Sequence, residues 1–248
     1  MSDRPILILG GTAEASNLAS RLIAKDRRVI SSLAGRTRDP ATPKGEVRIG
    51  GFGGARGLIA YIVKHDVSVL IDATHPFATQ ISDNAILAAA STKTPFVRLE
   101  RPAWHARPGD NWSIVASLEE AVSAIPAKAR VLLALGRQHI APFSRRGDVH
   151  FVVRMIDPPE APLDLVDFEL ALSKPGEVDE ETVFLTTKRL THIICRNSGG
   201  AASYTKIKAA RDLGIPVIMI DRPHRPSTHR VPDIESVILF VDKTLGSV

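Results

Sequence analysis

An apolar run that ends at two glycines and continues as a helical pattern sets the strongest limit on the fold. Residues 6–9 (ILIL) are apolar throughout, and Gly10 and Gly11 come before residues with helical spacing. A strand without polar alternation is typical of a parallel sheet that helices cover on both faces. The segment therefore predicts the first strand–turn–helix unit of an α/β protein.

The same alternation recurs along the chain. Strands are expected where apolar runs follow helical patterns, in RVISSLAG, EVRIG, VSVLIDAT, TPFVRLERP, ARVLLALG, VHFVVRMI, THIICRN and IPVIMIDRP. Residues 167–174 and 179–188 are predicted to be helices, and a last helix is predicted over 233–245 with Asp233 as its cap. Such alternation is typical of doubly wound, mostly parallel sheets.

Two segments resemble each other and indicate two domains. Residues 67–102 and 191–223 both read as strand, polar loop, helix and a Pro-started strand, ending in Glu-Arg-Pro or Asp-Arg-Pro. We expect domains at 1–110 and 111–248, joined in or after the polar loop 103–111. Independent use of a common strand–helix–strand pattern remains an alternative explanation.

Composition narrows the function classes. The net charge of +5 comes from scattered basic residues, and aromatics are only 5%, which disfavours a nucleic-acid surface. Cys195 is the only cysteine, so intrachain disulfides and multi-cysteine metal sites are excluded. No apolar run has transmembrane length, and the N-terminus has no signal-peptide pattern. We expect a cytoplasmic protein without a metal ion, a nucleic-acid partner or a membrane partner.

The first turn nearly matches the dinucleotide-binding fingerprint G-x-G-x-x-G/A. Gly10 takes the first position and Ala15 the third, but Thr12 replaces the middle glycine. Backbone N–H groups at a helix start suit a pyrophosphate, and the Thr12 hydroxyl is expected to donate to a phosphate oxygen. A tight turn without a ligand is the alternative.

The end of the second strand favours NADP over NAD. A ribose diol is normally read by an acid about twenty residues after the turn, but the first acid here is Asp39. Ser31, Ser32, Arg36 and Arg38 precede it, and hydroxyls with an arginine suit a 2′-phosphate. The alternative is a solvated loop. The cluster GGFGGARG (50–57) is either a loop close to a ligand or a flexible turn.

Several motifs together resemble one family. They are ILILGGTAEASNLA, SLAGRT, GGFGG, DATHPFA, RLERPAW, LLALGRQ, CRNSGG and GIPVIMIDRP, which span nearly the whole chain. The chain resembles the precorrin-6A reductases of cobalamin biosynthesis and their cobalt-precorrin-6A counterparts. The resemblance implies two Rossmann-like domains with the active site in a cleft between them. It implies NADPH-dependent reduction of one double bond of a polycarboxylate tetrapyrrole, giving precorrin-6B without metal or flavin.

The resemblance also implies site residues. NADPH would be bound by Gly10, Gly11, Thr12, Glu14, Ala15, Ser31, Gly35, Arg36 and Gly53. The substrate would be bound by Arg101, Arg137, Asn197, Ser198, Gly199, Gly200, Lys206 and Arg222. For each of these cations, a solvated surface charge is the alternative. Transient contact with other corrin-pathway enzymes is left open, as is whether the substrate contains cobalt.

His75 is the expected catalytic acid. It follows an apolar strand and has the side chain that most readily exchanges protons near neutral pH. The alternatives are that it only shapes the turn before Pro76, and that solvent or a substrate carboxyl supplies the proton. Tyr204 and Lys208 form a Y-x-x-x-K pattern, but the glycine turn that accompanies it in short-chain dehydrogenases is absent, so we expect coincidence.

Two other functions remain open. One is an oxidoreductase or epimerase acting on another anionic substrate, and the other is a non-catalytic NADP-binding regulatory module.

Overall fold

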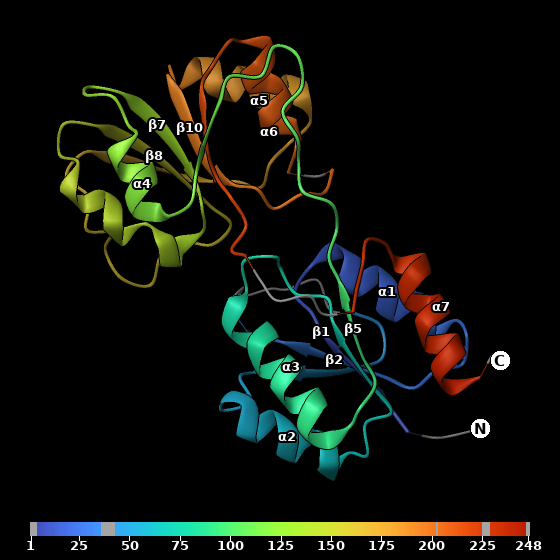
Figure 1. Ribbon diagram of the computed structural model, residues 1–248. Coiled ribbons are helices and arrows are strands. Elements are labelled where there is room, and N and C mark those ends of the chain that lie inside the picture. The colour runs from blue at the N-terminus through green and yellow to red at the C-terminus, as the bar shows by residue number, and fades with distance from the viewer. Residues whose placement is uncertain (1–3, 36–42, 202, 225–228, 247–248) are drawn as a thin grey trace. The chain divides into compact units, whose positions relative to one another are not determined.

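The chain forms two parallel-stranded α/β units, each built on a six-stranded sheet (Figure 1). A computed structural model describes residues 4–35, 43–201, 203–224 and 229–246. The first unit combines Met1–Arg101 with His224–Val248, and the second is Pro102–Pro223. All strand pairs among the described residues are parallel, as the apolar runs predict.

The first sheet has the order β12-β5-β4-β1-β2-β3. Its strands are β1 (Ile6–Leu9), β2 (Val29–Leu33), β3 (Glu46–Ile49), β4 (Val69–Asp72), β5 (Phe96–Leu99) and β12 (Arg230–Val231). Its helices are α1 (Ala13–Ile23), α2 (Gly54–Lys64), α3 (Thr79–Thr92) and α7 (Ile234–Leu245). Helices α1 and α7 cover one face and α2 and α3 the other (Figure 1).

Burial explains why these segments form a covered sheet. All four residues of β1 and of β4 are buried, because helices pack against both faces of these central strands. Helix α1 contributes Ala15, Leu18, Ala19 and Leu22, which recur at helical spacing and face the core. Helix α7 begins as predicted, with the Asp233 carboxylate accepting a hydrogen bond from the Ser236 amide.

The second sheet has the order β6-β11-β10-β7-β8-β9. Its strands are β6 (Trp112–Val115), β7 (Arg130–Ala134), β8 (His150–Met155), β9 (Phe168–Leu172), β10 (His192–Arg196) and β11 (Val217–Ile220). Its helices are α4 (Leu118–Ser123), α5 (Val178–Thr187) and α6 (Thr205–Asp212), with two 3₁₀ turns, η1 (Arg137–His139) and η2 (Ala141–Arg145). Helices α5 and α6 share one buried cluster with the central strands.

The two sheets exchange their sixth strands. If β12 and β6 are set aside, the other five strands of each sheet follow the order 3-2-1-4-5, numbered along the chain from β1 in the first sheet and from β7 in the second. The sixth strand of the first sheet is β12, which follows β11 of the second unit in sequence. The sixth strand of the second sheet is β6, which follows β5 of the first unit. The chain crosses between units at Glu100-Arg101-Pro102 and at Asp221-Arg222-Pro223, the two repeated tripeptides.

This topology departs from two expectations. The predicted domains 1–110 and 111–248 differ from the observed units, because residues 224–248 belong with the first unit and 102–110 with the second. The predicted helix at 167–174 is wrong, because Phe168–Leu172 pairs with β8 as strand β9. These apolar residues pair with β8 at the edge of the second sheet, and the sequence pattern alone does not reveal this pairing.

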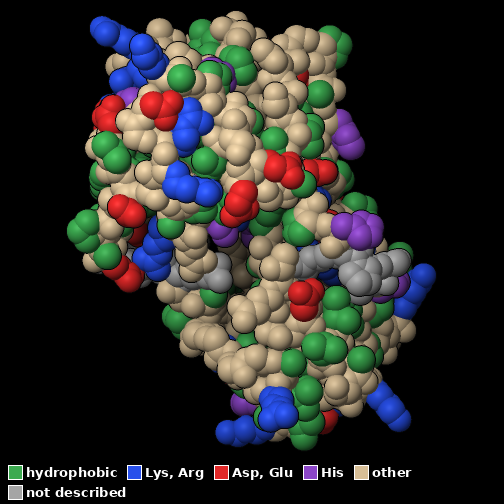
Figure 2. All heavy atoms as spheres, turned by 60° about the vertical axis from the view of Figure 1, so that its left-hand side comes forward, with side chains coloured by type: hydrophobic (Ala, Val, Ile, Leu, Met, Phe, Trp, Pro, Cys, Tyr) green, Lys and Arg blue, Asp and Glu red, His purple; other side chains and the backbone are tan. Residues whose placement is uncertain are grey.

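Two surface properties bear on partners. None of the helices in the described part of the chain combines the length and apolar character needed to cross a bilayer. On the face drawn in Figure 2, Lys and Arg side chains are interspersed with Asp and Glu and form no continuous basic patch.

Candidate functional site

The first sheet reverses its winding between β1 and β4. From β1 the chain continues to β2 and β3 on one side, and from β4 to β5 on the other. Ligands of open α/β sheets bind beyond the carboxyl ends of the strands at such a reversal. The turn from β1 to α1 (residues 10–12) and the loop from β4 to α3 (residues 73–78) both lie at this point.

The glycine turn is closely packed at Gly10 and open at Gly11. A Cβ added to Gly10 would lie 3.3 Å from the Cβ of Ala15, so this glycine allows α1 to pack closely on the strand. Gly11 has φ +104° and open space around its Cβ position, where a side chain would obstruct an approaching ligand. Gly10 and Ala15 thus form a close contact between strand and helix, Gly11 leaves open space, and nucleotide binding by these residues stays a prediction.

Thr12 uses its hydroxyl within the protein. The hydroxyl donates to the carbonyl oxygen of Ala73 (2.8 Å) and accepts from the amide of Ala15 (3.1 Å). Its single proton is committed to Ala73, so it does not donate outward as expected from the sequence. Thr12 instead caps α1 and ties the glycine turn to the end of β4. Since Thr12 occupies the Ala15 amide, the amides of Ala13 and Glu14 are the first-turn groups left as anion donors.

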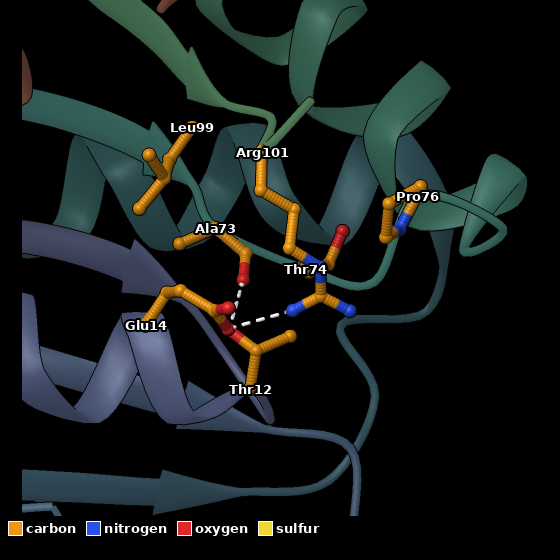
Figure 3. A pocket seen from close by; sticks show the side chains of 7 residues that line it. All are labelled: Thr12, Glu14, Ala73, Thr74, Pro76, Leu99 and Arg101. Atoms are coloured by element: carbon orange, nitrogen blue, oxygen red, sulfur yellow. Dashed lines mark hydrogen bonds and ion pairs between the residues drawn. The ribbon is translucent and has the colours of Figure 1, made fainter. Parts of the chain in front are cut away.

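A small pocket opens beside this turn (Figure 3). Its lining is Thr12, Glu14, Ala73, Thr74, Pro76, Leu99 and Arg101. The Arg101 guanidinium reaches the Glu14 carboxylate at 2.7 Å, at the positive end of α1. The structure thus brings together Glu14, a predicted cofactor residue, and Arg101, a predicted substrate residue.

The loop after β4 is braced from within. Asp72 is fully buried and accepts hydrogen bonds from the amide (3.1 Å) and hydroxyl (2.6 Å) of Thr74. The amide of Phe77 donates to Nδ1 of His75 (3.3 Å). A ring nitrogen that accepts carries no proton, so the neutral ring of His75 has its proton on Nε2. His75 lies at the carboxyl edge of the sheet, as predicted.

Arg98 forms a buried ion cluster behind this loop. It is 2% exposed and lies 3.6 Å from Asp72 Oδ2 and 3.2 Å from Glu100 Oε2. Arg98 was not among the predicted site residues. The sequence signals that point to it are its place at the start of the RLERPAW motif and its position next to the Glu-Arg-Pro repeat.

Of the residues predicted to bind the ribose phosphate, the structure describes Ser31 and Gly35 but not Arg36. Ser31 is 2% exposed, and its hydroxyl has no hydrogen-bond partner among the described residues. Gly35 is exposed with φ +71°, and Arg36 lies outside the described residues. The cation observed at the end of β2 is Arg48 of β3, whose Nη1 donates to the Ser32 hydroxyl at 3.1 Å. Sequence reasoning missed Arg48 because only the pairing of β2 with β3 brings it there.

The second glycine cluster begins helix α2. Gly53 is the residue before the helix, with φ +78° and open space around its Cβ position. Gly57 passes so close to the carbonyl of Phe52 that a Cβ would meet that oxygen at 1.6 Å. The cluster is therefore a tight turn with an open outer side at Gly53, which is compatible with a nearby ligand.

The second sheet reverses its winding between β7 and β10 in the same way. Arg196 ends β10, and the 3₁₀ turn η1 after β7 carries Arg137 and His139. Arg137 pairs with Glu160 at 2.8 Å, and Arg196 donates to Nε2 of His139 at 3.1 Å. Arg137, a predicted substrate residue, and Arg196, next to the predicted Asn197, thus both lie at the carboxyl edge of this sheet.

Asn197 joins two of the recognised motifs. Its amide accepts from the Trp104 amide (2.8 Å) and donates to the Trp104 carbonyl (3.0 Å). The Trp104 indole donates to the carbonyl of Gly200, and Arg222 Nε donates to the carbonyl of Asn197. Asn197 and Ser198 are buried, at 5% and 7% exposure, so Asn197 organises the loop through Gly199 and Gly200 from inside.

Lys206 is not a surface cation. It is 4% exposed, and its ammonium donates to the Ser203 carbonyl (2.6 Å) and lies over the Trp104 ring. Burial lowers the pKa of Lys206, although Cys195 and Glu181 act in the opposite direction. Lys206 therefore holds the backbone at Ser203 and packs on Trp104 from inside the second unit. Burial also raises the pKa of the Cys195 thiol, which keeps it unreactive.

Tyr204 and Lys208 do not form a catalytic pair. The Tyr204 hydroxyl accepts from Arg211, and Lys208 forms an ion pair with Asp212 at 2.9 Å. This supports the interpretation of Y-x-x-x-K as coincidence. Within the described residues, no three His, Cys, Asp or Glu side chains are grouped to hold a metal ion.

A glycine turn at the reversal of one parallel sheet, with a second unit of the same strand order, defines a Rossmann-type two-unit α/β protein. The family model for precorrin-6x reductase CbiJ/CobK matches residues 5–242. The chain therefore belongs to the precorrin-6x reductase family. A reductase family implies a redox cofactor.

Individual relatives agree with this assignment. The chain is 44% identical to a precorrin-6A reductase of Rhodobacter capsulatus over 94% of each chain. It is also 44% identical to one of Rhodococcus erythropolis, covering 95% of this chain and 96% of the relative. A solved CobK precorrin-6A reductase superposes with a TM-score of 0.94 at 42% identity, covering 98% of both chains.

Proposed function

We propose that this chain reduces precorrin-6A to precorrin-6B with NADPH, a step of cobalamin biosynthesis. The observation that carries the proposal is the open glycine turn at the β1–β4 reversal, in a chain of this reductase family. As a biosynthetic enzyme it would act in the cytoplasm, in transient contact with other enzymes of the pathway.

The first unit has the groups that a dinucleotide needs. Gly11 leaves space for a close approach, and the first turn of α1 presents amides and the positive helix end to a pyrophosphate. Thr12 and Ala15 fix the angle of α1 relative to β1 through the cap and the close contact with Gly10. When bound, NADPH supplies the hydride for the reduction.

The second unit has charges suited to a polycarboxylate substrate. Arg196 ends β10 and Arg137 lies in the turn after β7, both at the carboxyl edge of the sheet, and Arg222 follows β11 at the same edge. Guanidinium groups bind carboxylates in a bidentate geometry. In this proposal the substrate carboxylates replace the Glu160 carboxylate on Arg137, while Asn197 and Lys206 hold the loop in place.

His75 is proposed to be the catalytic residue that handles the proton. The backbone contact at Nδ1 leaves the ring proton on Nε2, so His75 can donate a hydrogen bond from that atom to a ligand. Brace contacts from Asp72 to Thr74 and from Thr12 to Ala73 restrict the loop that carries it. As the acid, His75 would react as the imidazolium, in which Nδ1 also carries a proton and gives up the contact with the Phe77 amide. Transfer of the Nε2 proton to the reduced product would then leave the ring neutral.

Binding and turnover test the proposal separately. We expect calorimetry to show NADPH binding, and single turnover with NADPH to reduce precorrin-6A faster than cobalt-precorrin-6A. A Gly11→Val variant should lose nucleotide binding, while Gly214→Ala, at a turn in the second unit, should keep it. NADPH binding without turnover of either substrate would contradict the reductase assignment.

A further inference from the structure

The structure assigns to Arg48 the recognition of the adenosine 2′-phosphate, and with it the preference for NADPH over NADH. Arg48 is a cofactor-specificity residue in this inference, which rests on the nucleotide site proposed above. No sequence motif identified this residue, because its neighbours are set by strand pairing.

Strand register places Arg48 at the ribose end of the site. In the β2–β3 pair, Ser32 is opposite Arg48 and Leu33 is opposite Ile49, at the carboxyl ends of both strands. The end of the second strand is where Rossmann-type sheets read the adenosine ribose. Arg48 Nη1 lies 3.1 Å from the Ser32 hydroxyl at this end, which pairs a guanidinium with a hydroxyl.

The guanidinium is held rigidly by neutral groups. Nη1 donates to the Gly50 carbonyl as well as to Ser32, and Nη2 donates to the Gly51 carbonyl at 2.6 Å. The guanidinium carbon lies 3.7 Å from the centre of the Phe52 ring, which is packed edge-on against Tyr61. Such fixed geometry lowers the entropy cost of binding a phosphate.

Its charge is not neutralised by the described part of the chain. No carboxylate among the described residues lies within ion-pair distance of Arg48, and the nearby Glu46 pairs with Arg28 at 3.6 Å. These contacts use three of the five guanidinium N–H groups and leave Nε and one Nη2 hydrogen as donors. An oriented cation with free donors at the ribose end suits a phosphate, and the described residues place no carboxylate beside it for a ribose diol.

A purely structural role makes a different prediction. If Arg48 only held the GGFGG loop, its removal would weaken NADPH and NADH binding equally. If it binds the 2′-phosphate, its removal weakens only ligands that carry this group. The ratio of the two affinities therefore separates the two roles without any measurement of turnover.

The test compares two variants and a control in the full chain. Arg48→Met keeps the stem over Phe52 without the charge, and Arg48→Lys keeps the charge without the fork. Arg28→Met removes one positive charge from the opposite end of the same strand pair. Calorimetry measures NADPH, NADH, 2′,5′-ADP and 5′-AMP binding to each protein.

We expect Arg48→Met to weaken NADPH and 2′,5′-ADP binding by at least about tenfold, with NADH and 5′-AMP nearly unchanged. Arg48→Lys should lie in between, and Arg28→Met should keep the wild-type ratio. An unchanged NADPH-to-NADH ratio in Arg48→Met would overturn the inference. If the wild type bound none of the four ligands, the proposed nucleotide site itself would fail, which is a different result.

Discussion

The side-chain amide of Asn197 exchanges two hydrogen bonds with the backbone of Trp104, at 2.8 and 3.0 Å. Trp104 follows the first crossing between the units, and Arg222, which precedes the second, donates to the carbonyl of Asn197. One buried residue thus anchors both connecting segments to the second unit. The RLERPAW and CRNSGG motifs therefore meet at this residue.

Asn197→Ala should destabilise the second unit. The change leaves the amide and carbonyl of Trp104 without their partners in a buried setting, which costs about 2–4 kcal/mol. Urea denaturation followed by Trp fluorescence would measure it. Asn17→Ala, on the exposed side of α1, is the control and should change stability by less than about 0.5 kcal/mol. Equal effects of the two variants would show that the Trp104 contact contributes little.

Thr12→Val should show what the hydroxyl of Thr12 contributes, because Val keeps the shape of the side chain without the hydroxyl. It removes the cap of α1 and the bond to Ala73, at a cost of about 1–2 kcal/mol. NADPH affinity should fall as well, because the glycine turn is no longer tied to β4. Thr12→Ser keeps both bonds and should retain stability and affinity. Thermal unfolding and calorimetry compare the stability and the NADPH affinity of the two variants. If Thr12→Val matched Thr12→Ser in both, the bond from Thr12 to Ala73 would not be what holds the glycine turn.

Removing only one partner of the buried ion pair Arg154–Glu181 should lower the free energy of unfolding strongly. The residues are 7% and 2% exposed and share two hydrogen bonds of 2.7 and 2.9 Å. Glu181→Leu strands the guanidinium and should cost about 3–5 kcal/mol, whereas adding Arg154→Met should recover part of that loss. The half-exposed pair Lys208–Asp212 is the control, and Asp212→Asn should cost less than about 0.5 kcal/mol. Denaturant unfolding measures all variants, and an additive double variant would refute the coupling.

Burial of Lys206 should make the free energy of unfolding change with pH in the alkaline range. Burial holds its pKa in the folded protein below the ordinary 10.5. Between the folded and unfolded pKa values the unfolded chain binds more protons, so stability rises with pH in that window. The destabilisation caused by burying the charged ammonium is complete below the pKa of Lys206 in the folded protein, and it vanishes above about 10.5. Relative to Lys206→Met, the wild type should therefore gain free energy of unfolding as pH rises from neutral to about 10. A constant difference across that range would contradict it.

The sequence predicts most of the core elements of both sheets because their strands are buried on two faces and keep an apolar run. Segments such as VLIDAT and VIMIDRP therefore need no partner to be recognised. Edge strands are different. Phe168–Leu172 has exposed Leu170 and Leu172, and its pattern fits a helix as well as a strand until β8 lies beside it. The placement of β12 and α7 in the first unit depends on long-range pairing, which no local pattern contains.

The candidate site shows the same limit. Gly10, Gly11 and Ala15 are recognisable because backbone geometry requires small residues in that order. Arg48 was missed because its partners, Ser32 and Phe52, become neighbours only through register and a turn. Lys206 was expected to bind the substrate, with a solvated surface charge as the alternative. Its burial was not foreseen, since it depends on the packing of Trp104 over the ammonium, which sequence spacing does not reveal.

The exchange of sixth strands also fixes the order in which the protein can be completed on the ribosome. The second unit is continuous and has all its strands once Pro223 has left the exit tunnel. The first unit begins earlier but must wait for α7, whose Val237, Ile238 and Val241 cover the same core face as α1. The nascent chain therefore carries an uncovered apolar surface throughout synthesis of the second unit, and the unit that starts first is finished last.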